Sequence, residues 1–241
     1  MNDISLEDYF EGQRVIPTVA ASEFIRLTHP DISDSTARGY VAALVDQGKL
    51  KRVGKGKYVL GASKDYSPNL SVEYMDFNRL LKKNFPFLDI CIWHTSQLNE
   101  FIQHQLVKHL LLIEVEQETV DSVFEFVKDA GYSALSDPSL DILEKYMASE
   151  GDTYIIKPLV SESPLLKVDA ALTASLEKML VDVFCDKSIF NSIQGAEMIA
   201  LFENALDKYT INMDRLFRYA GRRGKKSEME QYIEKIESNK R

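Results

Sequence analysis

Three carboxylates and a lysine are spaced as in a metal-dependent nuclease. Asp89 lies in one apolar segment and, 25 residues later, Glu114 and Glu116 close another. In restriction-like nucleases, carboxylates in this arrangement hold a divalent ion that activates water, and a lysine stabilises the charge that develops on the phosphate. Glu116 stands where that lysine is expected, although Lys157 in a third apolar segment can replace it. The alternative is that Asp89 caps the start of a strand while Glu114 and Glu116 share a solvated strand face. We expect no catalytic residues, with the nuclease as the alternative.

A basic and aromatic segment, DRLFRYAGRRGKK, could bind a charged partner. Arg215, Arg218 and Arg222 recur at helical spacing and Arg223 follows them. These four arginines form a candidate surface for an acidic partner or for RNA. Equally, Arg222 and Arg223 lie between two glycines at a helix end, where cations offset the helix dipole. The sequence leaves both readings open.

Other common catalytic signatures are missing from the sequence. It holds no G-x-x-x-x-G-K-[ST], G-x-G-x-x-G or G-x-S-x-G, the motifs of phosphate loops, dinucleotide sites and hydrolase elbows. Cys91 and Cys185 lie far apart in apolar segments, and the four histidines lack metal-ligand spacing. We expect buried thiols, no metal and no cofactor.

The charge is unevenly distributed along the chain. The 241 residues have a net charge of −8, which disfavours a protein that coats nucleic acid. Between Ser33 and Lys64, however, seven lysines and arginines face only two aspartates. This segment is basic enough to dock on phosphates.

The basic segment follows two predicted helices. Apolar residues at helical spacing predict a first helix that Thr18 caps and that ends before Pro30. They predict a second helix that Ser33 or Asp34 caps and that ends at Gly48. This order is typical of a helix-turn-helix.

Two short strands, 50–53 and 57–60, then flank a glycine-containing turn and complete a winged helix-turn-helix over residues 1–62. In such a domain, the outward residues at the start of the second helix read base edges in the major groove, while basic flanking groups hold phosphates. Tyr40 either contacts the DNA backbone or completes the apolar face of the helix. The predicted DNA-binding residues are Ser35, Thr36, Arg38, Tyr40, Lys51, Arg52, Lys55 and Lys57.

A polar linker over 63–70 leads to a larger domain over 71–241. This domain alternates helices and strands, which predicts a mixed α/β core containing Trp93, Phe85 and Phe87. From about Asp169 the pattern becomes entirely helical, and we expect this region to pack on the sheet. The fold class is thus α+β. The expected helices are 72–85, 96–107, 119–130 and 139–148, and the expected strands are 87–93, 110–116 and 153–159.

The chain resembles the AbiEi-like antitoxins of abortive-infection toxin–antitoxin systems, in which a winged helix-turn-helix precedes an α/β antitoxin domain. The resemblance lies in the opening ISDSTARGYVAALVDQGKLKRVGKGKYVL, in the central strands ending in TYIIKPLV, and in the helix SLEKMLVDVFCD. It implies a repressor of its own promoter that counteracts a nucleotidyltransferase-type toxin. Whether that toxin is bound directly is left open.

We therefore predict a non-enzymatic transcriptional regulator that binds double-stranded DNA, as a monomer or weak dimer that could assemble cooperatively. A protein-interaction adaptor is a further alternative to the nuclease. No apolar run approaches the roughly 20 residues of a membrane span, and the start MNDISLEDYF lacks a signal-peptide pattern. We expect a cytoplasmic protein without membrane contact.

Overall fold

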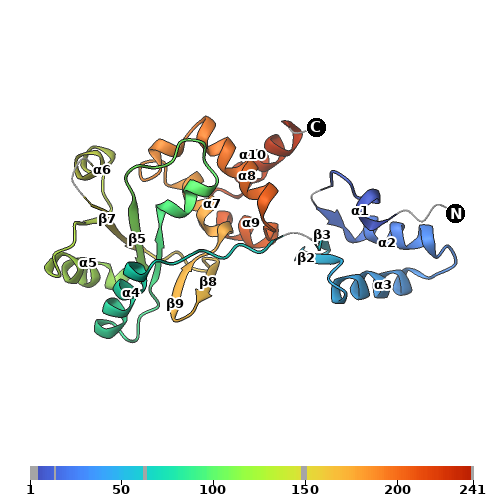
Figure 1. Ribbon diagram of the computed structural model, residues 1–241, viewed down its shortest axis with the longest axis horizontal. Coiled ribbons are helices and arrows are strands. Elements are labelled where there is room, and N and C mark those ends of the chain that lie inside the picture. The colour runs from blue at the N-terminus through green and yellow to red at the C-terminus, as the bar shows by residue number, and fades with distance from the viewer. Residues whose placement is uncertain (1–4, 14, 62–63, 148–150, 240–241) are drawn as a thin grey trace. The chain divides into compact units, whose positions relative to one another are not determined.

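The computed structural model describes residues 5–13, 15–61, 64–147 and 151–239, which form two compact units (Figure 1). The first unit is Met1–Asp65 with Lys208–Arg215, and the second is Tyr66–Asp207 with Leu216–Arg241. The fold is mixed α+β, and its C-terminal part is helical. Among the described residues, no helix is both long and apolar enough to cross a membrane.

The first unit packs three helices against a small antiparallel sheet of order β1-β3-β2. Its core joins Phe10 just after α1, Ile16 of β1, Phe24 of α2, Val41 of α3 and Leu50 of β2, so the helices and the sheet are held by one apolar cluster. The elements are α1 (Leu6–Tyr9), β1 (Ile16–Pro17), α2 (Thr18–Thr28), α3 (Asp34–Asp46), β2 (Leu50–Gly54) and β3 (Lys57–Leu60).

The ends of α3 confirm the predicted signals, whereas the start of α2 does not. Ser33 caps α3 by accepting a hydrogen bond from the Thr36 N–H, and Gly48 takes a φ of +70° just after the helix. Thr18 is no cap, because it lies inside α2 and Pro17 precedes the helix without a side-chain bond. The reason is that β1 runs directly into α2, and the Thr18 N–H is already bonded to the Gly56 carbonyl of the hairpin.

The second unit is built on a six-stranded mixed sheet of order β6-β7-β5-β4-β9-β8. β5, β7 and β6 run parallel, β4 is antiparallel to β5 and parallel to β9, and β8 is antiparallel to β9. The strands are β4 (Cys91–His94), β5 (Leu110–Val115), β6 (Ala134–Ser136), β7 (Thr153–Pro158), β8 (Leu165–Val168) and β9 (Ala171–Ala174). The helices are α4 (Val72–Asn84), η1 (Thr95–Glu100), η2 (Gln117–Thr119), α5 (Val120–Asp129), α6 (Leu140–Met147), α7 (Leu176–Cys185), η3 (Asn191–Ile193), α8 (Ala196–Lys208), α9 (Met213–Arg222) and α10 (Lys226–Asn239).

Two predicted helical stretches are wrong. The helix expected over 96–107 is only the short η1, because Phe101 and Ile102 are both buried and the Asn99 side chain closes a loop onto the Leu106 backbone. The helical pattern expected from Asp169 begins instead with β9, which lies inside the sheet between β4 and β8. Asp169 adopts a φ of +52° in the turn from β8 to β9, a conformation that aspartate tolerates in tight hairpins.

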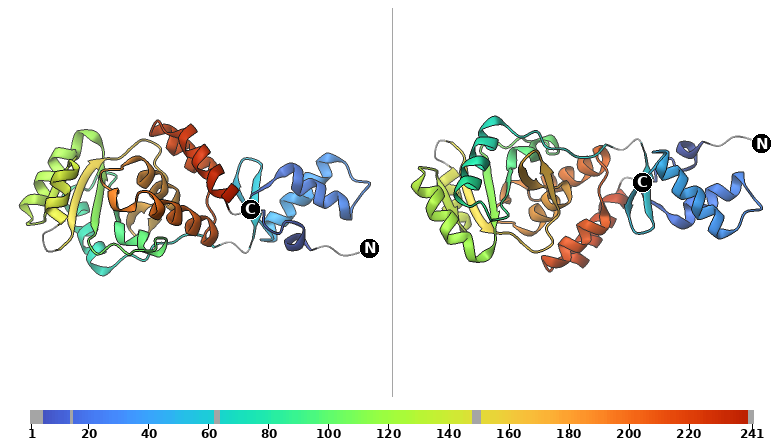
Figure 2. Two further views of the ribbon diagram at one scale, coloured as in Figure 1. Left: turned by 90° about the horizontal axis from the view of Figure 1, so that it is seen from above. Right: turned by 90° about the horizontal axis from the view of Figure 1, so that it is seen from below.

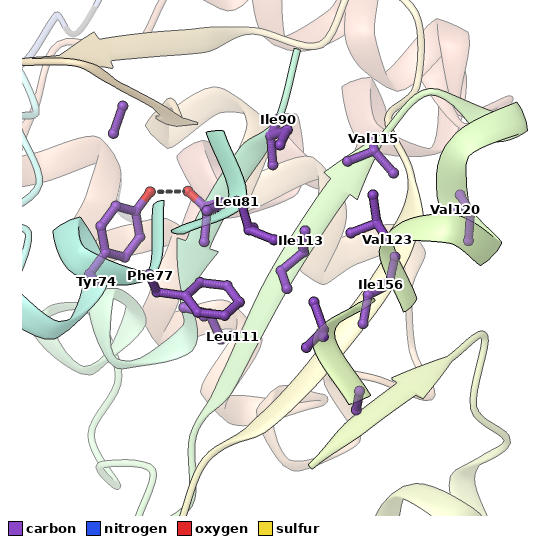
Figure 3. Close-up of a cluster of buried hydrophobic side chains, with 14 residues drawn as sticks. Tyr74, Phe77, Leu81, Ile90, Leu111, Ile113, Val115, Val120, Val123 and Ile156 are labelled. Atoms are coloured by element: carbon purple, nitrogen blue, oxygen red, sulfur yellow. Dashed lines mark hydrogen bonds between the residues drawn. The ribbon is translucent and has the colours of Figure 1, made fainter. Parts of the chain in front are cut away.

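Helices cover both faces of the sheet in the second unit. Alternate side chains of the strands, such as Ile92, Ile113 and Ile156, pack against α4 and α5 in one buried cluster (Figure 3). The orange to red helices of the C-terminal part lie on the side of the sheet opposite to α5 (Figure 2). Trp93 is fully buried as predicted, but Phe87 is 97% exposed because it lies in the turn before β4 rather than in a strand.

Candidate functional site

The N-terminal half of α3 presents a polar face to solvent. Ala37 and Val41 of this helix are buried in the core of the first unit, so residues on the other side of the helix point outward. Ser35, Thr36 and Arg38 are exposed there, as the predicted DNA-binding role requires. All three residues are therefore accessible near the start of α3, and Ser35 and Arg38, three residues apart, are neighbours there.

The groups on this surface differ in their existing contacts. The Ser33 hydroxyl oxygen lies 2.8 Å from that of Ser35 and 2.9 Å from that of Thr36. Tyr40 is 40% exposed, and its ring centroid lies 4.8 Å from that of His29 in a tilted arrangement, so it lies outside the apolar core. Within the described residues, no carboxylate pairs with Arg38, which leaves its guanidinium available to a ligand.

The β2–β3 hairpin carries the remaining predicted cations, and most of them already have partners. Lys51 pairs with Asp65, and the Arg52 Nε donates to the Gly54 carbonyl at 3.2 Å. In the same unit, the Asp214 carboxylate accepts from the Lys55 backbone N–H at 2.5 Å and lies 3.5 Å from the Lys57 ammonium. The Lys55 residue at the turn is exposed. The hairpin thus keeps a basic tip, although Asp214 offsets part of its charge.

The proposed nuclease residues do not form a metal site. Glu114 and Lys157 are neighbours across β5 and β7, but the Lys157 ammonium pairs with Asp186, and Asp89 and Glu116 are exposed outside the strands. Among the described residues, no three potential ligand side chains are grouped to hold a metal ion. The reading of Glu114 on a solvated face is also wrong, because this residue is only 1% exposed.

Glu114 belongs to a buried ionic network on the sheet face that α7 covers. Lys178 of α7 places its ammonium 2.7 and 2.8 Å from the two Glu114 carboxylate oxygens and 2.5 Å from Asp182 Oδ2. The Trp93 indole N–H donates to the same Glu114 carboxylate at 3.1 Å. The Tyr219 hydroxyl donates to Asp182 Oδ1 at 2.8 Å, so every carboxylate in the centre is bonded on both sides.

The outer part of the network neutralises its centre. Arg223 bonds to Asp182 Oδ1 at 2.8 Å and to Asp186, which in turn holds Lys157. Burial alone lowers the pKa of Lys178, but the carboxylates of Asp182 and Glu114 outweigh it and raise the pKa of this ammonium well above its usual value. The network pairs six ionic groups, with equal numbers of the two signs. They are three cations, Lys157, Lys178 and Arg223, and three anions, Glu114, Asp182 and Asp186.

This network changes the interpretation of the C-terminal arginines. Arg223 is no part of an open surface, because its guanidinium is held by Asp182 and Asp186. Arg222 and Arg218 both pair with Glu162, which neutralises part of the exposed strip. Arg215 is half-buried, and its backbone N–H bonds to Asn212. The four arginines thus do not form one free basic patch.

The sequence contains one indication of this network, a pair of charged residues inside the apolar helix α7. Lys178 and Asp182 stand four residues apart inside SLEKMLVDVFCD, in a segment that is otherwise mostly apolar. Charged residues at such positions are buried only when they are paired. The partners Glu114 and Tyr219 lie 64 and 41 residues from Lys178 in the sequence, so only the folded structure reveals these contacts.

Comparison with known proteins places most of the chain in one family. Residues 36–239 match the model of a family of unknown function (DUF6577). A search of curated proteins gives no match.

Proposed function

The chain belongs to the DUF6577 family of unknown function, and from its first unit we propose that it is a DNA-binding transcriptional regulator. The order α1, β1, α2, α3, β2, β3, with β1 joining the hairpin in one antiparallel sheet, is the order of a winged helix-turn-helix. In such a domain, α3 is the recognition helix and the β2–β3 hairpin is the wing.

The observation that carries the proposal is the exposed start of α3, where Arg38 stands without a carboxylate partner among the described residues. A helix of this width fits the major groove, and a bidentate arginine is the commonest reader of guanine. Ser35 and Thr36 beside it can donate to phosphates or base edges. The basic tip at Lys55 then holds the adjacent backbone, which makes the affinity dependent on salt.

The nuclease alternative receives less support from the geometry. Glu114 would have to give up two hydrogen bonds from the Lys178 ammonium before it could bind a metal ion. The exposed carboxylates Asp89 and Glu116 are not joined with it in a ligand cluster among the described residues. A buried carboxylate neutralised by a lysine is suited to holding the fold rather than to activating water.

The resemblance to AbiEi-like antitoxins extends the proposal to a biological role. In that role the first unit represses the promoter of its own gene, and the second unit counteracts a nucleotidyltransferase-type toxin. Co-expression with a toxin gene from the same operon tests this part separately. Growth rescued by the wild-type chain and by Arg38→Ala supports a toxin-directed function of the second unit, whereas no rescue by either contradicts it.

The DNA-binding proposal is tested with the DNA immediately upstream of this protein's own gene. We expect a mobility shift that survives a scrambled competitor and weakens steeply between low and physiological salt. A shift that the scrambled competitor abolishes would indicate non-specific DNA binding. No shift at low salt would reject DNA binding altogether.

A further inference from the structure

A cavity of about 340 Å³ lies in the second unit, beside the N-terminal part of α4. Its wall includes residues of α4, the end of β4 with the following η1, and the start of β7. This volume is in the range of sites for small organic ligands, which span about 300 to 1,000 Å³. None of the predicted DNA-binding residues lines it.

Part of the cavity wall is apolar and firmly packed. Tyr74, Phe77 and Leu111 line it and lie together at one end of the buried cluster (Figure 3). The Tyr74 hydroxyl donates to the Ile92 carbonyl at 2.5 Å, so this wall offers a ring rather than a free polar group. Tyr154 also lines the cavity, and its ring centroid lies 5.0 Å from that of Phe77. The wall thus presents aromatic surface that is fixed by the core.

The polar part of the wall carries negative charge without a matching cation. Glu73 and Asp152 line the cavity, whereas no lysine or arginine does so among the described residues. Hydrogen bonds from its own backbone N–H and from Ser71 lower the pKa of the Glu73 carboxyl, so it is ionised at neutral pH. An anionic ligand such as a phosphate would meet repulsion here.

His94 fixes the position of the Asp152 carboxylate. The His94 Nδ1 accepts from the Ser96 backbone N–H at 3.4 Å and lies 2.5 Å from the Ser96 hydroxyl oxygen, which orients the ring. Nε2 lies 3.2 Å from Asp152 Oδ2 and donates to it. One carboxylate oxygen is therefore held by the protein, and the other is left to accept from a ligand.

Gln97 also lines the cavity, but its side-chain oxygen is buried and has no accessible surface through which a ligand could reach it. The accessible wall thus combines two anionic acceptors, Glu73 and Asp152, with an aromatic surface.

We propose that this cavity binds a small organic cation, an amidinium or primary ammonium carried on a short apolar or flat body. Its N–H groups would bond to Asp152 and Glu73, since charge-assisted hydrogen bonds are the strongest that such a site can form. Its body would lie on the rings of Phe77 and Tyr154, where aromatic faces attract cations. The inference concerns the second unit and is independent of DNA binding by the first.

The test is a calorimetric titration of the full chain with benzamidine, benzamide and benzoate, which share one shape and differ in charge and donors. We expect benzamidine to bind at least about tenfold more tightly than benzamide, and benzoate not to bind. Three equal affinities, or no binding of benzamidine at millimolar concentration, would overturn the proposal. Tighter binding of Mg²⁺ than of benzamidine would also overturn it.

Single substitutions test whether benzamidine binds in this cavity. Asp152→Asn and Glu73→Gln should each weaken benzamidine by about tenfold, because each removes one charged acceptor. Asp141→Asn removes an equally exposed acid on α6, outside the cavity, and should leave the affinity unchanged. Since Glu73 and Asp152 are both exposed, the variants should melt within a few degrees of the wild type, so that lost binding is not lost folding. Equal affinities across all four proteins would place the bound probe elsewhere and refute the site.

Discussion

Replacing Lys178 by methionine should destabilise the second unit strongly. The methionine fills most of the lysine volume but leaves Glu114 and Asp182 buried without the ammonium that bonds to both. Breaking a buried ion pair by removing one partner costs about 3 to 5 kcal/mol. Arg223 and Tyr219 still hold Asp182, so the uncompensated charge falls mainly on Glu114.

The assay can follow this network through its own fluorophore. Trp93 is the single tryptophan of the chain, is fully buried and donates to Glu114. Its emission during urea unfolding therefore reports on the second unit. With a slope of about 2 kcal/mol per molar urea, the expected loss moves the midpoint down by about 1.5 to 2.5 M.

Two further variants serve as controls for the predicted effect of Lys178→Met. Lys128→Met removes an exposed ammonium 3.9 Å from Glu125 and should cost less than about 1 kcal/mol. In Lys178→Met with Glu114→Gln, the uncompensated carboxylate is gone, so part of the lost stability should return. A Lys178→Met midpoint equal to that of Lys128→Met, or a double variant less stable than the sum of its single changes, would refute a stabilising role for the network.

Three other predictions follow from single groups. Burial raises the pKa of the Cys185 thiol to about 11 and that of the Cys91 thiol well above its usual value, so both should react slowly with a disulfide reagent in the folded chain and rapidly in denaturant; fast labelling of the native protein would contradict this. Burial, aided by His94, lowers the pKa of His109, so its contribution to stability is present above its unfolded pKa of about 6.5 and is lost as the pH falls through the lower folded value. His109→Gln should therefore flatten the dependence of the urea midpoint on pH between about 7 and 5, and an unchanged slope would argue against it. Asp214→Asn should increase DNA affinity severalfold at low salt by freeing the charge of the hairpin, and an unchanged or weaker affinity would show that this carboxylate does not oppose DNA.

Local signals in the sequence were sufficient for α2, α3, β2 and β3 of the first unit, but not for the short α1 and β1. In the second unit they predicted most of the helices and the strands β4, β5 and β7, but not β6, β8 or β9. A capping serine before α3 and a glycine after it act within a few residues, so a pattern can find them. The strand β9 was missed because it has only four residues and runs into the apolar helix α7, and short apolar segments do not distinguish strand from helix.

The functional groups show the same division between local and long-range information. Ser35 and Arg38 are neighbours on one side of α3 because they lie three residues apart. The cavity, in contrast, joins Glu73, His94 and Asp152 from separate elements, and no motif connects residues so far apart. The sequence also grouped Glu114 with Asp89 and Glu116, whereas the fold pairs it with Lys178 on α7.

The role of α3 in reading DNA can be measured by fluorescence anisotropy of the full chain on the DNA upstream of its gene and on a scrambled duplex. Arg38→Ala should weaken binding to the upstream DNA by about 1 to 3 kcal/mol and change binding to the scrambled duplex much less. Arg79→Ala, which removes an exposed arginine from α4, serves as the matched control and should bind both duplexes like the wild type. Equal affinities of Arg38→Ala and the wild type for the upstream DNA would contradict base reading by α3.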